Sequence, residues 1–324
     1  MFNLDVTLVF GKFGDRQLIS LRNGNATDLL TGSRFLWTSV LALLAITSSM
    51  DRPFAHEVWI EPTTTHLSKG ETLSADLRIG DMFKGDHLIY IPQQTERLLV
   101  LTDTGSFDLK PRVGSRPVIT VAPEKLAKNS GNVVLVYQSA NSYVHYGSQE
   151  KFLRFARKKG AGDLGQSHKR RRLPQSGFVE RYKRFAKAII TIGPETEMVN
   201  DRVVGMELEF VSLGKKLLSN SRLEFQFQLL YQGRMLPAAQ VTLFSRDRDG
   251  LVTSSKIMTD EDGVISINAD AEHRYLLDHV TLRETDPLKD RNRPVWESLW
   301  ASLTFAGLGS CGSHKQNPVP NTCF

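Results

Sequence analysis

Apolar and polar residues alternate along much of the chain between residues 57 and 192. In the segment Leu73–Ile79 every second position is apolar, and Gly70 and Gly80 bound the segment. A period of two gives a strand one buried face and one wet face. Further short runs rich in Val, Ile and Leu lie between Gly, Pro or Asn residues, at 97–101, 118–121 and 133–137. This pattern predicts the strands of an antiparallel β-sandwich.

Two segments, 149–159 and 179–188, instead show the three-to-four spacing of an amphipathic helix. Their aromatic and alanine residues share one side, and Lys and Arg residues fill the other. We predict a helical hairpin over 149–188 that lies on the sandwich. The basic run 168–172 stands between Gly-rich and Pro-containing stretches, and we interpret it as a solvated loop of this hairpin.

The clearest strand opens a second region of the chain. From Leu223 to Tyr231 apolar residues occupy every second position, and a Gly-containing turn follows. Further predicted strands lie at 240–244, 264–267, 275–282 and 298–305, with an Asp-Gly turn over 259–263. We therefore predict a mainly β fold of two β-sandwich domains. The first covers 56–204 with the helical insertion, and the second, over 205–306, is immunoglobulin-like or transthyretin-like; a disordered tail spans 307–324.

An apolar run from Phe35 to Ile46 follows Arg34 and precedes a polar stretch that ends at Ala55. The run is shorter than the roughly 20 residues that a membrane span needs. A basic flank, an apolar centre and a small residue at the cut are the order of a secretory signal. We predict that residues 1–55 are a leader and signal peptide, and that the mature protein is periplasmic or secreted. Cleavage would leave His56 at the amino terminus, and no membrane span follows it.

Charge and cysteine content exclude several classes of protein. The net charge of +6 comes with no recognisable nucleic-acid-binding motif, so we expect no nucleic-acid partner. The two cysteines, Cys311 and Cys323, both lie in the predicted tail. They either close a disulfide in an oxidising compartment or remain thiols. Without a Cys-x-x-Cys pair, tetrathiolate zinc and dithiol redox sites are excluded.

Three stretches of the chain, 56–62, 180–187 and 296–305, resemble an exported bacterial family of unknown function that carries a NikM-like label. The resemblance runs in order from His56 to Phe305. It implies a periplasmic, mostly β protein with a carboxy-terminal immunoglobulin-like domain. Through the label it also implies a link to nickel and cobalt uptake, and hence a membrane metal transporter as a partner. Members of the family often carry a His-Met pair where this chain has Thr281 and Leu282.

An amino-terminal histidine offers its α-amine and its imidazole to a metal in one chelate ring. Nitrogen ligands suit Cu(II) and Ni(II) in tetragonal sites. We predict a transition-metal site for Ni, Co or Cu made by His56, Glu57 and His279. His279 precedes Thr281 by two residues and therefore shares its strand face. His145 and His87 are further candidates.

These features predict an accessory protein that binds a metal and passes it to a membrane transporter, and not an enzyme. Gly309–Gly312 lacks the spacing of a hydrolase elbow, and Asp247–Gly250 lacks that of a calcium loop. One alternative is a structural or non-metal ligand-binding sandwich. Another is a copper-dependent oxidative enzyme, because such enzymes also use an amino-terminal histidine on a sandwich. Three tryptophans either pack inside the fold or mark a carbohydrate surface: Trp59, Trp296 and Trp300.

Overall fold

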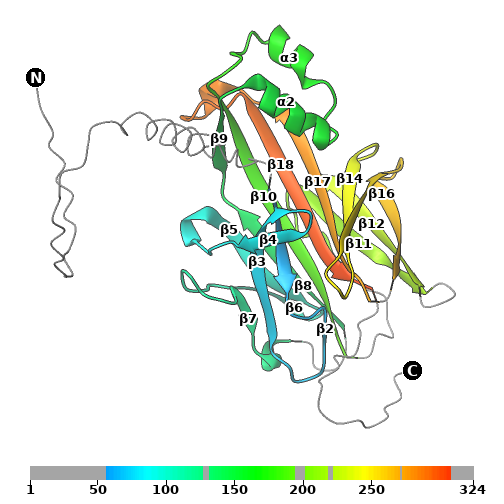
Figure 1. Ribbon diagram of the computed structural model, residues 1–324. Helices are drawn as coiled ribbons and strands as arrows, with labels where there is room; N and C mark the ends of the chain where they lie inside the picture. The colour runs from blue at the N-terminus through cyan, green and yellow to red at the C-terminus, as the bar shows by residue number, and fades with distance from the viewer. Residues whose placement is uncertain (1–55, 127–130, 194–200, 218–221, 271, 308–324) are drawn as a thin grey trace, which may run out of the picture. The chain divides into compact units, whose positions relative to one another are not determined.

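The computed structural model describes residues 56–126, 131–193, 201–217, 222–270 and 272–307. The predicted leader, nearly all of the predicted tail and both cysteines lie outside the described residues. The described strands form three sheets, with one large sheet between two smaller ones (Figure 1). The prediction of a mainly β fold built from sandwiches is confirmed.

The middle layer is a ten-stranded sheet. From edge to edge its main strands are β15 (Val252–Met258), β14 (Gln240–Arg246), β17 (Arg274–Glu284), β18 (Trp296–Ala306), β10 (Phe178–Ile192), β8 (Gly131–Ser139), β5 (Thr95–Thr102) and β6 (Gly105–Asp108). Two short strands, β2 (His66–Leu67) and β9 (Ser142–Tyr146), also pair with β10. Neighbouring strands are antiparallel, except that β10 runs parallel to β18 and to β2. The β10–β18 pair joins strands of the two predicted domains, so both halves of the chain share this sheet.

Two four-stranded sheets cover the two faces of the middle layer. One consists of β1 (Glu57–Pro62), β3 (Leu73–Asp81), β4 (Lys84–His87) and β7 (Ile119–Val121), and the other of β11 (Leu208–Leu217), β12 (Arg222–Tyr231), β13 (Arg234–Met235) and β16 (Val264–Asp270). Alternation along β10 divides its apolar residues between two cores. Ala186, Ala188 and Ile190 pack toward the sheet of β1, whereas Phe185 and Ile189 pack toward the sheet of β12. The predicted domain boundary at residue 204 falls between β10 and β11, and the division into two domains stays a prediction.

Two helices, α2 (Gln149–Lys158) and α3 (Leu164–Arg170), lie over one end of the middle sheet (Figure 1). The Asp163 side chain accepts a hydrogen bond from the backbone N–H of Gly165 at 3.0 Å, which caps the start of α3. The predicted helix at 149–159 is confirmed, but the basic run 168–172 is not a plain loop, because its first residues belong to α3. Within the described part of the chain, neither helix has the length and apolar sequence needed to cross a membrane.

The second predicted helix, over 179–188, is wrong, because these residues form most of β10. This strand has neighbours on both edges and packed layers on both faces, so it shows no wet face to produce a clean period of two. Two charged residues, Glu180 and Lys187, are buried in it. Together with the half-buried Arg181, Lys183 and Arg184, Lys187 gave the segment an amphipathic pattern that mimics a helix.

Two tryptophans of β18 pack against α2. The Trp296 ring centre lies 5.3 Å from that of Phe152, and the Trp300 ring stacks on Phe155 at 5.4 Å. Trp59 is buried in the β1 strand and meets Phe83 edge to face. Of the two alternatives for these tryptophans, the structure shows packing inside the fold, with Trp296 and Trp300 against α2. Buried rings cannot serve as a carbohydrate-binding platform.

Candidate functional site

A buried lysine joins three elements of the fold. Lys159 directly follows α2, and its Nζ lies 2.7 Å from Oε1 of Glu57 in β1 and 2.7 Å from Oδ2 of Asp278 in β17. The three side chains are only 4%, 1% and 2% exposed. Nζ also lies 4.8 Å from the centre of the Trp300 ring, which adds a cation–π contact. We refer to Glu57, Lys159 and Asp278 as the buried triad.

The buried triad brings two carboxyl groups to one ammonium group, and this imbalance shifts their protonation. Burial and, to a smaller extent, the charge of Asp278 raise the pKa of Glu57, Lys159 opposes the shift, and the net pKa is about 7. Burial by itself lowers the pKa of Lys159, but Asp278 and Glu57 outweigh it, so the net shift is upward. Lys159 is therefore charged at neutral pH, while Glu57 exchanges its proton near neutrality.

Glu57 also carries an unused hydrogen-bonding atom. Its Oε2 is buried and, within the described part of the chain, has no hydrogen-bond partner. Buried polar atoms are nearly always paired, and a lone one calls for an explanation such as a ligand or a bound water. This carboxyl oxygen is therefore an acceptor that the described residues leave unpaired.

A cleft of about 390 Å³ opens beside the buried triad. Its volume falls within the range of roughly 300 to 1,000 Å³ that is usual for small-molecule sites. It is lined from five elements by Glu57, Asp81, Met82, Lys158, Lys159, Thr242, Phe244, Ser254, Ser255 and Lys256. The exposed Lys256 donates a long hydrogen bond of 3.4 Å to the carbonyl oxygen of Lys158 and forms no ion pair with any described residue. The cleft thus combines hydroxyl groups, a cation and an apolar patch.

The β3–β4 hairpin forms one wall of the cleft and requires glycine at two positions. A Cβ at Gly80 would lie 2.0 Å from the carbonyl oxygen of Lys84, and one at Gly85 would lie 2.3 Å from that of Ile79. The close approach of the two strands therefore excludes any side chain there. At the turn Met82 has a φ of 53°, a left-handed conformation that is uncommon outside glycine.

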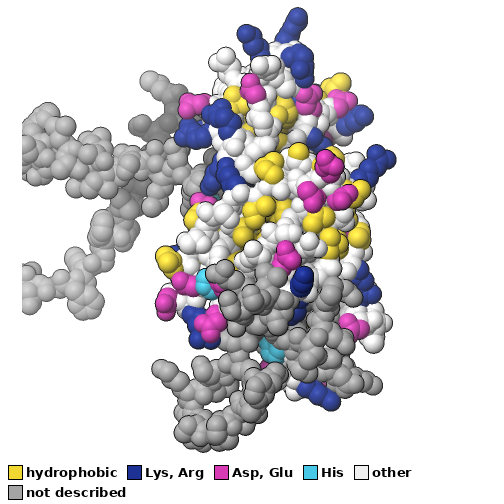
Figure 2. Space-filling model, turned by 90° about the vertical axis from the view of Figure 1, so that its right-hand side faces the viewer, with side chains coloured by type: hydrophobic (Ala, Val, Ile, Leu, Met, Phe, Trp, Pro, Cys, Tyr) yellow, Lys and Arg dark blue, Asp and Glu magenta, His cyan; other side chains and the backbone are white. Residues whose placement is uncertain are grey.

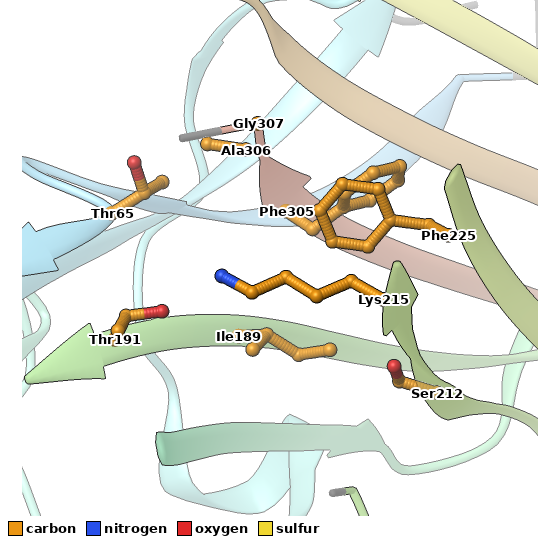
Figure 3. A pocket seen from close by; sticks show the side chains of 9 residues that line it. All are labelled: Thr65, Ile189, Thr191, Ser212, Lys215, Phe225, Phe305, Ala306 and Gly307. Atoms are coloured by element: carbon orange, nitrogen blue, oxygen red, sulfur yellow. The ribbon is translucent and has the colours of Figure 1, made fainter. Parts of the chain in front are cut away.

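A second cavity lies between the middle sheet and the sheet of β12 (Figure 3). Figure 3 shows the side chain of Lys215 running along it, with the amine directed toward Thr65 and Thr191. Its volume of about 20 Å³ suits a single water molecule. This cavity is too small for a substrate or a metabolite, so the cleft beside the buried triad is the better candidate site.

The fold does not bring the three predicted metal ligands together. Glu57 is held by Lys159, and His279 follows Asp278 directly in β17, so its side chain lies on the opposite face of the strand. His279 Nδ1 lies 2.8 Å from the carbonyl oxygen of Gln240, and Nε2 lies 3.0 Å from Oγ1 of Thr281. Burial lowers the pKa of His279 and keeps the imidazole neutral.

His56 lies just before β1 and is half-buried. Its carbonyl oxygen accepts a hydrogen bond from Nη2 of Arg184 at 3.2 Å, and its Nδ1 is buried without a hydrogen-bond partner among the described residues. In the same residues, no group of three or more His, Cys, Asp or Glu side chains is arranged to hold a metal ion. The predicted set of His56, Glu57 and His279 therefore does not fit a metal as one site.

The remaining histidines have separate surroundings. His87 lies 3.3 Å from Asp76, and His145 is exposed on β9 instead of packed. His168 is buried in α3, where its Nδ1 accepts a hydrogen bond from Nε1 of Trp296 at 3.1 Å. Its other nitrogen lies 2.9 Å from the carbonyl oxygen of Pro174 and must carry the proton. His168 is thus a packing residue whose tautomer the two bonds decide.

Sequence reasoning found Glu57 but missed its two partners in the buried triad. A signal existed for Asp278, which is a carboxylate inside the apolar strand segment 275–282. An acidic residue at such a position is rarely fully buried unless it is paired. No comparable signal marks Lys159, because several lysines and arginines precede it in α2.

A family model matches residues 54–282 and is described as a domain of unknown function, DUF4198. The chain belongs to the DUF4198 family. The matched segment contains the whole buried triad and every residue that lines the cleft, and it ends within β17. The predicted membership of an uncharacterised family is confirmed, whereas the family description mentions neither nickel nor cobalt. No curated protein matches the chain.

Solved structures resemble this DUF4198 protein only weakly. A tetra-tandem repeat from the extending region of a large adhesion protein is 11% identical over 78% of this chain and 49% of that chain, with a TM-score of 0.19. The D0-D1 domain of intimin is 10% identical over 76% and 97%, with a TM-score of 0.18. Salmonella alpha-2-macroglobulin reacted with methylamine is 12% identical over 78% and 15%, with a TM-score of 0.19. Scores this low support no argument about function.

Proposed function

We propose that this DUF4198 protein is an exported, non-catalytic binding protein and that the cleft beside the buried triad is its ligand site. The observation that carries the proposal is Oε2 of Glu57, a buried carboxyl oxygen without a partner among the described residues, on a side chain that lines the cleft. Leaving such an atom unpaired costs about 1–3 kcal/mol. A ligand that donates a hydrogen bond to this oxygen recovers that free energy on binding.

The other lining residues indicate the chemistry of the ligand. Lys256 offers an exposed ammonium group, and Ser254, Ser255 and Thr242 offer hydroxyl groups among the residues that line the cleft. Phe244 provides an apolar surface for a carbon skeleton. These groups suit a small carboxylate with several hydroxyl groups, such as a sugar acid. One of its hydroxyls donates to Glu57, and its carboxylate meets Lys256.

Isothermal titration with glucuronate, glucose and glucosamine tests this proposal. The three sugars have similar size and differ in charge, and we expect glucuronate to bind most tightly. Lys256→Gln should weaken glucuronate about tenfold, which corresponds to about 1.4 kcal/mol. Lys84→Gln is the matched control, because Lys84 is exposed in the β3–β4 hairpin that forms one wall of the cleft but does not itself line the cleft. Equal affinity for all three sugars, or no binding, would overturn the proposal.

A second candidate function is transition-metal binding at His56, for delivery to a membrane transporter as the NikM-like resemblance implies. The observation that favours it is the buried Nδ1 of His56 with no partner among the described residues. Cleavage after Ala55 would add the α-amine to this imidazole. Since Glu57 and His279 are engaged elsewhere, the chelate of His56 is the donor set that remains.

Titration with Cu(II) and Ni(II) of two forms tests the second candidate. One form begins at His56, and the other carries a single extra residue before it. Tight binding by the first form alone supports an amino-terminal metal site. Equal binding by both forms, or none, contradicts it and leaves the cleft as the site to pursue.

A further inference from the structure

The end of the protein that carries the helices has a larger net positive charge than the chain as a whole. We define the basic cap as residues 149–172 and 285–295, which cover α2, α3 and the β17–β18 loop. The basic cap contains 12 Lys and Arg against 4 Asp and Glu, a net charge of +8, whereas the whole chain has a net charge of +6. Figure 2 shows Lys and Arg side chains projecting from this end of the molecule, and others spread over the rest of the visible face.

The two segments of the basic cap form one surface. Arg171, at the end of α3, donates hydrogen bonds of 2.8 Å to the carbonyl oxygens of Thr285 and Val295, at the two ends of the loop. Arg170 pairs with Glu284 at 3.3 Å, at the last residue of β17. These contacts hold the β17–β18 loop against α3. The exposed charges of the loop and of α3 therefore lie on adjacent elements.

The exposed cations of the basic cap are largely uncompensated. Within the described residues, six of them are exposed and form neither an ion pair nor a side-chain hydrogen bond: Arg157, Lys169, Arg172, Lys289, Arg291 and Arg293. Cations deeper in the fold behave differently, as Arg181 shows by pairing with Asp290 and Glu297. A cluster of four to eight unpaired Lys and Arg residues is typical of surfaces that bind anionic lipids.

An exposed leucine stands among these cations. Leu288 is 84% exposed, the largest fraction among the large hydrophobic residues of the described chain. It belongs to the short 3₁₀ helix Pro287–Lys289 in the β17–β18 loop, directly before Lys289 and three residues before Arg291. An apolar side chain flanked by cations suits the boundary between lipid headgroups and acyl chains.

We propose that the basic cap docks on an anionic phospholipid surface, with Leu288 entering the headgroup region. The six uncompensated cations supply attraction to lipid phosphates, and Leu288 supplies the apolar contact. A soluble polyanion would use the cations alone and would leave Leu288 in water. The exposed leucine is therefore the observation that favours a membrane surface over other anionic partners.

Co-sedimentation of the full chain with lipid vesicles tests the proposal. We expect binding to vesicles of mixed phosphatidylglycerol and phosphatidylcholine in excess of any binding to phosphatidylcholine alone. The variant Arg157→Glu/Lys169→Glu/Arg172→Glu should lose more than about tenfold in affinity for the mixed vesicles. A control with the same change in net charge, Lys69→Glu/Lys84→Glu/Arg234→Glu, alters exposed residues outside the basic cap and should change affinity less than about twofold.

Leu288→Gln separates lipid insertion from simple charge attraction. We expect this variant to bind the mixed vesicles severalfold more weakly, with binding that is more easily reversed by salt. Two results would overturn the proposal. One is an equal loss of affinity in both charge-reversed variants. The other is wild-type vesicle binding by Leu288→Gln together with tight binding of soluble polyphosphate, which would make the basic cap a general polyanion site.

Discussion

At the scale of single residues, Lys159 matters most to the candidate site. Its removal leaves Glu57 and Asp278 buried beside each other without a counter-charge. Breaking a buried ion pair in this way typically costs about 3–5 kcal/mol. We therefore expect Lys159→Ala to lower the free energy of unfolding by about that amount in urea denaturation.

Two variants sharpen this prediction. Lys158→Ala changes the neighbouring lysine, which is exposed, and should alter stability by less than about 0.5 kcal/mol. The triple variant Glu57→Gln/Lys159→Met/Asp278→Asn removes all three charges and should recover most of the lost stability. If Lys159→Ala is as stable as wild type, the buried triad is not a stabilising feature of the fold.

Glu180 gives the protein a pH-dependent stability. It is buried in β10, accepts a hydrogen bond from Oγ of Ser298, and has a pKa that burial raises to about 7. Between about pH 4.5 and 7 the folded chain keeps a proton that the unfolded chain has released, so stability falls as pH rises through this window. Glu57 contributes with the same sign.

The variant Glu180→Gln tests this linkage. It keeps the shape of the side chain without a titrating group, and it should reduce the stability difference between about pH 5 and pH 8 by about 2–3 kcal/mol. Urea unfolding at the two pH values measures the effect. Because Glu57 titrates in the same window, the double variant with Glu57→Gln should flatten the slope further than Glu180→Gln alone. An unchanged slope in Glu180→Gln contradicts the assignment.

Residue identity alone predicts part of the candidate site. Glu57 was expected as a ligand residue, and it does lie at the cleft, but its partner Lys159 is 102 residues away in the chain. The sequence also gives no information on how far His279 lies from Glu57 in the fold. Strand alternation gives the face of a residue only relative to its own strand, and the structure places Asp278, not His279, on the face toward β1.

At the scale of elements, a strand could be predicted from the sequence when one of its faces is exposed to solvent. The strands β3 and β12 each have a wet face, and their period of two was visible in the sequence. β10 has layers on both faces, and its buried charges obscured the pattern. The helix α3 was missed because its sequence is basic and glycine-containing, and its capping residue Asp163 was the signal available.

Lys187 is one of the charges that obscured β10, and it holds another segment in place. Its Nζ lies 2.5 Å from Asp201 and 3.2 Å from Glu209, and all three side chains are buried. Glu209 in turn accepts hydrogen bonds from the backbone of Val204 and Met206. The network thereby fixes the connection that leads into β11.

We expect Lys187→Met to destabilise the protein by about 3–5 kcal/mol, because it leaves two buried carboxylates without a counter-charge. Lys183 provides a matched control in the same strand, since it pairs with Glu96 near the surface. Lys183→Met should cost less than about 1 kcal/mol. Thermal and urea unfolding of both variants measure the contrast, and equal losses would show that burial of the pair is not the cause.

At the scale of the whole molecule, the middle sheet makes the two halves of the chain depend on each other. The parallel pair of β10 and β18 extends from Glu180 and Trp296 to Ala188 and Thr304. One hydrophobic core contains Val136 and Phe185 from the first half together with many residues from the second. The buried triad and the Lys187 network also cross between the halves.

Separate expression of residues 56–204 and 205–307 tests whether the two predicted domains fold alone. The first fragment would expose the edge of β10 that pairs with β18, and an unpaired, apolar edge promotes aggregation. It would also leave Lys159 without Asp278. We therefore expect neither fragment to unfold cooperatively by itself, whereas co-expression should yield a complex with a cooperative transition. Cooperative unfolding of each isolated fragment would instead show that the halves are independent domains and that the shared sheet is a late interface between them.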